Sequence, residues 1–103
     1  MPRLAKVAAV EEISPGEMKS FEIDGRQILV ANVEGKYYAM DALCSHDFWD
    51  LSEGTLEGNK VVCPGHAAVW NLETGTAEFD EELKPLTTYK IFVREGFVYL
   101  ELD

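Results

Sequence analysis

Short apolar runs separated by glycine-containing dipeptides are the feature that most limits what this chain can fold into. Asp24-Gly25 lies between two strand-like runs, residues 18–23 and 26–33. A dipeptide of this type is a strong signal for a two-residue β-hairpin turn. Glu95-Gly96 separates two later apolar runs in the same way. The pattern predicts a series of antiparallel hairpins rather than a helical protein.

Strand-like runs recur along most of the chain. The expected strands are residues 18–23, 26–33, 37–41, 59–63, 67–72, 76–79, 86–94 and 97–102. Helix is expected at most as a turn or two at 80–84, because Pro85 stops it. Closely spaced strands with glycine turns predict an all-β fold, a small antiparallel sandwich or barrel. The stretch 42–58 has no confident element, and long loops of this kind usually carry function or hide a missed element.

Length and charge narrow the possible classes of protein. With 103 residues the chain has room for a single domain, residues 1–103. Its 47% apolar and 27% charged residues are an ordinary globular balance, which excludes a disordered or collagen-like chain. Nineteen acidic residues against nine scattered basic ones give a net charge of −10, which excludes a nucleic-acid partner.

Nothing in the sequence predicts a membrane or export segment. No stretch approaches the roughly 20 apolar residues that a membrane span requires, and the N-terminus has too short an apolar stretch for a signal peptide. Two cysteines are too few for a disulfide framework and suit a reducing compartment. We therefore expect a soluble, cytoplasmic protein with no membrane partner.

The only two cysteines and two histidines of the chain come as two mixed pairs. Cys44 and His46 are separated by one residue, Cys63 and His66 by two, and 16 residues (47–62) lie between the pairs. Thiolates are soft ligands that suit zinc or iron–sulfur clusters, and imidazole suits iron or zinc. Two cysteines and two histidines can therefore form a tetrahedral zinc site or bind a [2Fe–2S] cluster.

The order of the ligands favours the cluster. Zinc fingers usually group like residues, two cysteines followed by two histidines, whereas here each short segment supplies one of each. If one iron takes both cysteines and the other both histidines, two loops must clasp the cluster from opposite sides. A zinc-stabilised interaction module, a Cys44–Cys63 disulfide, or buried thiols beside unrelated histidines remain as alternatives.

The motif C-x-H, 16 residues, C-P-x-H resembles the Rieske iron–sulfur motif. Further segments are also similar to this family: L-S-x-G-x-L-x-G at 51–58, W-N-L-x-T-G at 70–75, and P-L at 85–86 followed by Y-K-I at 89–91. The resemblance spans nearly the whole chain. It implies a relationship to the small, low-potential ferredoxins of ring-hydroxylating oxygenase systems.

The resemblance implies a Rieske-type antiparallel β-sandwich or barrel with a cluster-binding subdomain. Two loops, at about residues 42–58 and 63–70, would form this subdomain. Cys44 and Cys63 would hold the buried iron of a [2Fe–2S] cluster. His46 and His66 would hold the outer iron near the surface, where their ring edges would be the exit for electrons.

The function implied is that of a one-electron carrier. It would pass electrons from a flavin-dependent ferredoxin reductase to a terminal oxygenase, a ring-hydroxylating dioxygenase, and it would be a monomer. Once His46 and His66 are cluster ligands, no histidine remains for a mononuclear iron site, and no nucleophile–base pair remains. We therefore do not expect an enzyme. The alternative within electron transfer is the small subunit of a nitrite reductase-like system.

Some positions differ from the high-potential members of the family. Those proteins carry an extra, disulfide-bridged cysteine in each loop, and the matching positions here are Trp49 and Gly65. Their serine and tyrosine hydroxyls near the cluster are matched by Ala68 and Trp70, so both donors are expected to be absent. We therefore expect a potential near the low end of the roughly −150 to +300 mV Rieske range. Phe48 and Trp49 are expected to pack over the cluster, with a docking surface as the alternative.

Acidic residues gather near the predicted site. Segments 41–58 and 73–82 each contain five acidic residues and no lysine or arginine. They could form a negative ring that steers the protein toward basic patches on its partners. A charged face that only keeps the protein soluble is the other interpretation, and the sequence favours neither.

Overall fold

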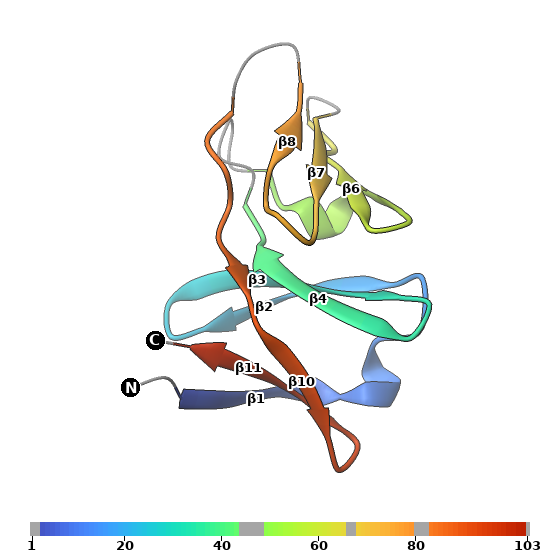
Figure 1. The fold of residues 1–103 in the computed structure, drawn as a ribbon, viewed down its shortest axis with the longest axis vertical. Coiled ribbons are helices and arrows are strands. Elements are labelled where there is room, and N and C mark those ends of the chain that lie inside the picture. Colours follow the sequence, from blue (N-terminus) through green and yellow to red (C-terminus); the bar gives the residue numbers. More distant parts are fainter. Residues whose placement is uncertain (1–2, 44–48, 66–67, 80–82, 103) are drawn as a thin grey trace.

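Three antiparallel sheets form the computed structural model, which describes residues 3–43, 49–65, 68–79 and 83–102 (Figure 1). The sheet orders are β1-β11-β10, β2-β3-β4-β9 and β5-β6-β7-β8. The strands are β1 (Arg3–Ala9), β2 (Met18–Ile23), β3 (Arg26–Val33), β4 (Lys36–Asp41), β5 (Thr55–Glu57), β6 (Lys60–Val62), β7 (Val69–Asn71), β8 (Ala77–Glu78), β9 (Thr88–Tyr89), β10 (Ile91–Arg94) and β11 (Phe97–Leu102). The helical segments of the described residues are two 3-10 turns, η1 (Val10–Glu12) and η2 (Leu51–Glu53). The expected antiparallel all-β fold is confirmed.

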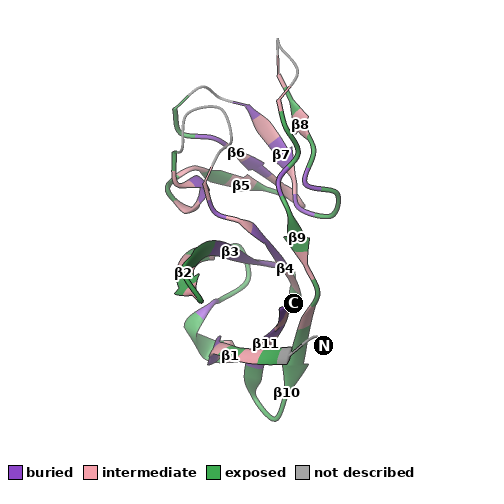
Figure 2. Cartoon of the chain, turned by 90° about the vertical axis from the view of Figure 1, so that its left-hand side faces the viewer, coloured by how far each residue is buried: buried purple, intermediate pink, exposed green. Residues whose placement is uncertain are grey.

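The first two sheets form the base of the molecule, and the third sheet lies at the other end (Figure 1). Strand β3 explains how they are held together, because its two faces are both covered. Ile28 and Val30 belong to a core shared with Leu100 of β11, whereas Leu29 and Ala31 belong to a second core under the third sheet. Alternate residues of a strand point to opposite faces, so one apolar run supplies both cores (Figure 2).

Two-residue turns connect the hairpins as the sequence predicts. Asp24 has φ 53° and Gly25 has φ 77°, and Glu95 and Gly96 repeat the pair at 51° and 82°. Two successive positive φ values are required by the type I′ turn, whose twist matches that of the flanking strands. Register across the first turn runs from Ile23↔Arg26 to Met18↔Ala31 without a break.

Three segments differ from the sequence prediction. Strand β1 was not expected; it pairs with β11 and has an irregularity between Lys6 and Ala8, where alanines make the alternation weak. The stretch 42–58 contains η2 and β5, so part of the supposed loop is regular structure. The predicted strand 86–94 is two strands, because β9 pairs with β4 and β10 with β11. Several other strands are shorter than predicted; β7 begins at Val69, for example.

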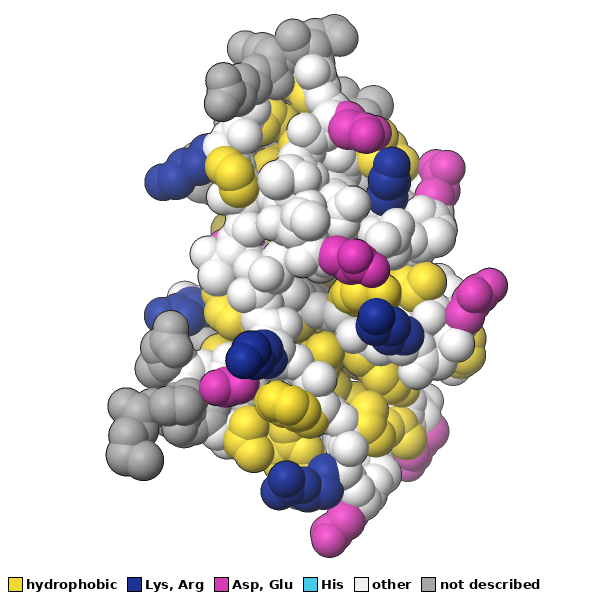
Figure 3. Space-filling model, in the orientation of Figure 1, with side chains coloured by type: hydrophobic (Ala, Val, Ile, Leu, Met, Phe, Trp, Pro, Cys, Tyr) yellow, Lys and Arg dark blue, Asp and Glu magenta, His cyan; other side chains and the backbone are white. Residues whose placement is uncertain are grey.

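Some large apolar side chains are exposed on the surface of the described residues. Apolar side chains gather over the base half of the face in Figure 3, interspersed with charged ones. The β1-β11-β10 sheet exposes four large apolar side chains: Leu4, Phe92, Val93 and Phe97. The Lys6 ammonium covers the Phe97 ring at 4.2 Å from its centroid. Within the described residues, no helix is long and apolar enough to cross a membrane.

Candidate metal centre

The first predicted cluster loop leaves and rejoins the fold at one place. Leu43 and Asp50 form an isolated antiparallel bridge, and the Leu51 N–H donates to the Ala42 carbonyl over 2.7 Å. The Asp50 carboxylate then caps η2 by accepting from the Ser52 N–H at 2.9 Å. Cys44 and His46 lie in the sequence between the bridged residues and outside the described residues. The fold thus closes the loop that contains the first predicted ligand pair.

The second predicted loop is closed in a similar way. The Cys63 N–H, which directly follows β6, donates to the Ala68 carbonyl over 2.8 Å, just before β7. Cys63 is a free cysteine with 2% of its surface exposed; Cys44, the other half of the disulfide considered from the sequence, lies outside the described residues. His66 lies outside the described residues.

The two loops press directly against each other at two glycines. A Cβ on Gly54 would overlap the Val62 carbonyl oxygen and crowd the Pro64 ring. A Cβ on Gly65 would overlap the indole of Trp49. A methyl group at Gly54 would meet the backbone of Val62, whereas one at Gly65 would displace the Trp49 side chain. The positions that carry bridging cysteines in high-potential Rieske proteins are thus filled here by an indole lying on a glycine.

Trp49 packs on Gly65, and 45% of its surface stays exposed. The expectation that Phe48 and Trp49 pack over the cluster concerns a different contact and stays a prediction. Phe48, its neighbour in that hypothesis, lies outside the described residues. Trp49 therefore links the loops and also forms part of the surface beside them.

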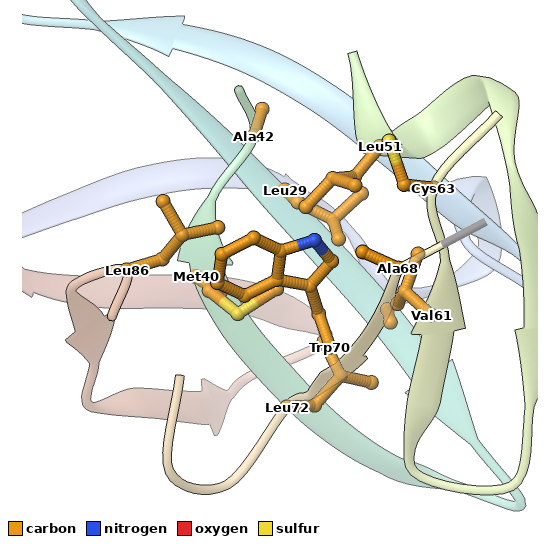
Figure 4. Close-up of a cluster of buried hydrophobic side chains, with 11 residues drawn as sticks. Leu29, Met40, Ala42, Leu51, Val61, Cys63, Ala68, Trp70, Leu72 and Leu86 are labelled. Atoms are coloured by element: carbon orange, nitrogen blue, oxygen red, sulfur yellow. The ribbon is translucent and has the colours of Figure 1, made fainter. Parts of the chain in front are cut away.

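A buried indole lies beneath the loops. Trp70 on β7 is fully buried, in one core with Leu51, Cys63 and Ala68 (Figure 4). Its Nε1–H is the one buried side-chain polar atom of the described residues that has no hydrogen-bond partner. A buried donor without an acceptor costs about 1–3 kcal/mol. From the sequence, Trp70 is expected only as the loss of a tyrosine hydroxyl; its indole N–H, itself a hydrogen-bond donor, is the signal that could have identified this residue.

A hydrogen bond between β4 and β9 fixes the start of the first loop. The Tyr89 hydroxyl donates to Asp41 over 2.6 Å, and the Thr87 N–H donates to the same carboxylate at 3.1 Å. Burial raises the pKa of Tyr89 to about 12, helped by the hydrogen bond to Asp41 and its negative charge. Asp41 immediately precedes the loop, so this pair anchors the strand end from which the loop departs.

Several acids near the site have partners within the protein. Asp41 and Asp50 accept the hydrogen bonds described above, and Glu73 accepts from the Tyr38 hydroxyl at 3.2 Å. Glu78 lies 3.7 Å from the Lys60 ammonium. These four carboxylates make hydrogen bonds or an ion pair within the protein. Fewer acidic residues are therefore left whose only role could be to steer the protein toward a basic partner.

The residues present suit a metal centre with mixed ligands. Among the described residues there is no group of three or more side chains that could hold a metal ion, since three of the four predicted ligands lie outside them. The fourth, Cys63, is buried in the apolar core, where a thiolate needs a counter-charge such as iron to be stable. The orphaned Trp70 N–H in the same core is a donor suited to a sulfur acceptor. The donor set and its surroundings therefore fit a sulfur-rich cluster.

Comparisons with known proteins agree with this picture. Residues 3–90 match the family model described as the Rieske [2Fe-2S] domain. The ferredoxin component of biphenyl 2,3-dioxygenase from Rhodococcus jostii (strain RHA1) is 37% identical over 97% of this chain and 94% of its own length. The 3-phenylpropionate/cinnamic acid dioxygenase ferredoxin subunit of Photorhabdus laumondii subsp. laumondii is 37% identical over 94% of this chain and 92% of its own.

A solved structure supports the same family assignment. A chain in the complex of reduced oxygenase and oxidized ferredoxin of carbazole 1,9a-dioxygenase is 33% identical, covering 94% of this chain and 91% of its own, with a TM-score of 0.87. The expected family and the expected [2Fe–2S] cofactor, held by two cysteines and two histidines, are both confirmed. This chain belongs to the Rieske [2Fe–2S] domain family.

Proposed function

We propose that this protein carries single electrons to the terminal oxygenase of a ring-hydroxylating dioxygenase system, after receiving them from a flavin-dependent ferredoxin reductase. Relatives that cover nearly the whole chain are named as ferredoxin components of such systems, which supports the proposal. The chain is an electron-transfer component and not itself the catalyst. We propose that it works as a cytoplasmic monomer.

We propose that Cys44, His46, Cys63 and His66 hold the cluster, within a single domain formed by residues 1–103. When bound, the [2Fe–2S] cluster supplies the one-electron chemistry. The cluster would be bound by the loops at about 42–58 and 63–70. A backbone hydrogen bond closes each of them, from Leu51 to Ala42 in the first and from Cys63 to Ala68 in the second. The observation that carries this assignment is the buried free Cys63 at the start of a closed loop, pressed against the first loop through Gly54 and Gly65. That contact brings the two loops together, which supports the proposal that their ligand pairs converge on one centre.

The first test is an EPR spectrum of the anaerobically reduced protein, with iron and acid-labile sulfide assayed on the same sample. We expect a rhombic signal with an average g value below that of all-cysteine clusters, because imidazole ligates one iron, and about two irons and two sulfides per chain. A colourless protein with one zinc per chain would contradict the cluster and favour an interaction module.

Replacing His46 or His66 by alanine tests the ligand assignment. Each variant should lose the cluster and its visible colour, because three ligands leave one iron open. Glu57→Gln, an exposed change on β5, is the control that should keep full iron and sulfide. A histidine variant that retained the unaltered EPR signal would contradict the assignment of that residue.

The partner is tested separately from the cluster. The reduced protein is mixed anaerobically with the oxidised terminal oxygenase of a biphenyl dioxygenase system, and absorbance follows the reoxidation of its cluster. We expect rapid electron transfer that depends on oxygenase concentration. An intact cluster that the oxygenase does not reoxidise would overturn the proposed partner while leaving the electron-carrier function in place.

A further inference from the structure

The unpartnered indole N–H of Trp70 requires an acceptor that the described protein atoms do not supply. Trp70 has 0% of its surface exposed, and its Nε1 has no hydrogen-bond partner. Buried polar groups in proteins are nearly always hydrogen-bonded, and an exception calls for a specific explanation such as a bound ion or cofactor. Water is a poor candidate for the missing partner, because the labelled neighbours of the ring are apolar side chains and one cysteine (Figure 4).

The position of the nitrogen indicates the direction of the missing acceptor. In Figure 4 the indole nitrogen lies on the side of the ring toward Leu29, Ala68 and Cys63, whereas the six-membered ring extends toward Leu86. Of these neighbours only Cys63 is a predicted cluster ligand, and its sulfur is not itself a partner of the N–H. The donor therefore faces the part of the core that borders the second cluster loop.

We propose that the Trp70 Nε1–H donates a hydrogen bond to a sulfur atom of the [2Fe–2S] centre other than the Cys63 thiolate, and thereby raises its reduction potential. This inference rests on the proposed cluster site. Reduction adds negative charge to the centre, and a hydrogen bond to sulfur stabilises that charge. Trp70 thus supplies one donor at a position where the sequence predicts none, and the potential lies above that of an otherwise identical centre without the N–H.

Trp70→Phe tests the proposal, because phenylalanine keeps an aromatic ring in the core and removes the N–H. We expect the cluster to assemble and its reduction potential to fall, with the reduction equilibrium shifted about tenfold, which is about 59 mV for a one-electron couple. Tyr37→Phe is the matched control, since it also removes a hydrogen-bond donor from an aromatic ring, the one that bonds the Val10 carbonyl beside the base core, and it should leave the potential unchanged. Protein-film voltammetry measures all three proteins.

An unchanged potential in a Trp70→Phe protein with an intact cluster would overturn the inference without affecting the proposed function. A wild-type protein that binds no iron or sulfide would instead overturn the proposed function. The two failures are therefore distinguishable.

A second measurement keeps the proposal testable if Trp70→Phe does not assemble. The Trp49→Phe protein contains a single tryptophan, Trp70, which can be labelled with 15N in the indole ring. Pulsed EPR of the reduced protein should detect a hyperfine coupling between the cluster and this 15N, together with an exchangeable proton that is lost in deuterated water. The absence of both couplings in a protein with a full cluster would overturn the hydrogen bond.

Discussion

At the scale of single residues, close contact between two side-chain positions replaces a covalent link between the loops. Trp49 lies on Gly65, and Gly54 lies on the Val62 carbonyl. An indole on a glycine backbone has a large apolar contact but no covalent constraint, so its contribution depends on the glycine staying bare. Each of these contacts depends on the missing Cβ of a glycine, which faces an indole at Gly65 and a backbone carbonyl at Gly54.

Gly65→Ala should therefore destabilise the protein by displacing Trp49. We expect a loss of about 1 kcal/mol in the free energy of unfolding, the low end of the cost of overpacking, because the displaced indole is half exposed. In a Trp49→Ala background the same substitution should cost little, because nothing then occupies the space of the new methyl group. Urea unfolding of the four proteins of this double-mutant cycle measures the coupling. Equal costs in both backgrounds would contradict the contact.

At the scale of elements, a single apolar run in the sequence divides between two sheets. Strand β9 pairs with β4, and β10 pairs with β11, although the sequence predicts one strand over 86–94. Between them, the Lys90 carbonyl accepts the Glu101 N–H at 3.0 Å. Tyr89 is the last residue before this change of sheet, and its bond to Asp41 holds β9 against β4 at the edge nearest the first loop.

The Tyr89–Asp41 bond predicts a loss of stability at alkaline pH. Because burial and Asp41 raise the pKa of Tyr89 from 10.0 to about 12, the folded state favours the neutral phenol. Its stabilising contribution is complete below about pH 10 and is lost as the pH rises through about 12. Tyr89→Phe should lower the free energy of unfolding by roughly 1–2 kcal/mol at pH 7, and this deficit relative to the wild type should shrink between pH 10 and 12.

Urea unfolding of both proteins at pH 7 to 12 measures this difference. Asp41→Asn keeps a hydrogen-bond acceptor without the negative charge, so the alkaline loss should be smaller in that variant. A deficit that stayed constant through pH 12 would contradict the raised pKa.

At the scale of the whole molecule, the described residues form two hydrophobic cores, and only one of them contains residues of the candidate site. The base core contains Ile28, Val30 and Leu100, whereas the upper core contains Leu51, Cys63 and Trp70. Strands β3 and β4 contribute buried residues to both cores. Packing changes in the base should therefore alter the free energy of unfolding without reaching the cluster environment.

Leu100→Ala and Leu51→Ala test this division, since both side chains are fully buried. Each should destabilise the protein by about 2–5 kcal/mol, the usual cost of removing a buried leucine side chain. Only Leu51→Ala should also shift the reduction potential or the EPR line shape, because Leu51 shares a core with Cys63 and Trp70. A potential that changed equally in both variants would show that the two cores are not independent.

Much of the fold was predictable because its signals are local. The Asp24-Gly25 and Glu95-Gly96 turns and the strands beside them form as expected, since two-residue turns depend on the backbone preferences of the residues within them. Strand β1 was not predictable in this way, because its alanines give weak alternation and its pairing with β11 joins the two ends of the chain. The division of 86–94 into two strands likewise depends on which partners lie alongside.

The candidate site was also predictable only in part from the sequence. The spacing of Cys44, His46, Cys63 and His66 identified the family and its cluster from the sequence, because ligand type and order are chemical properties that need no coordinates. Only the tertiary structure revealed the indole of Trp49 on Gly65 and the unpartnered N–H of Trp70 beneath the loops. Whether a polar atom is buried, and which residues far along the chain surround it, depends on packing that no local pattern records.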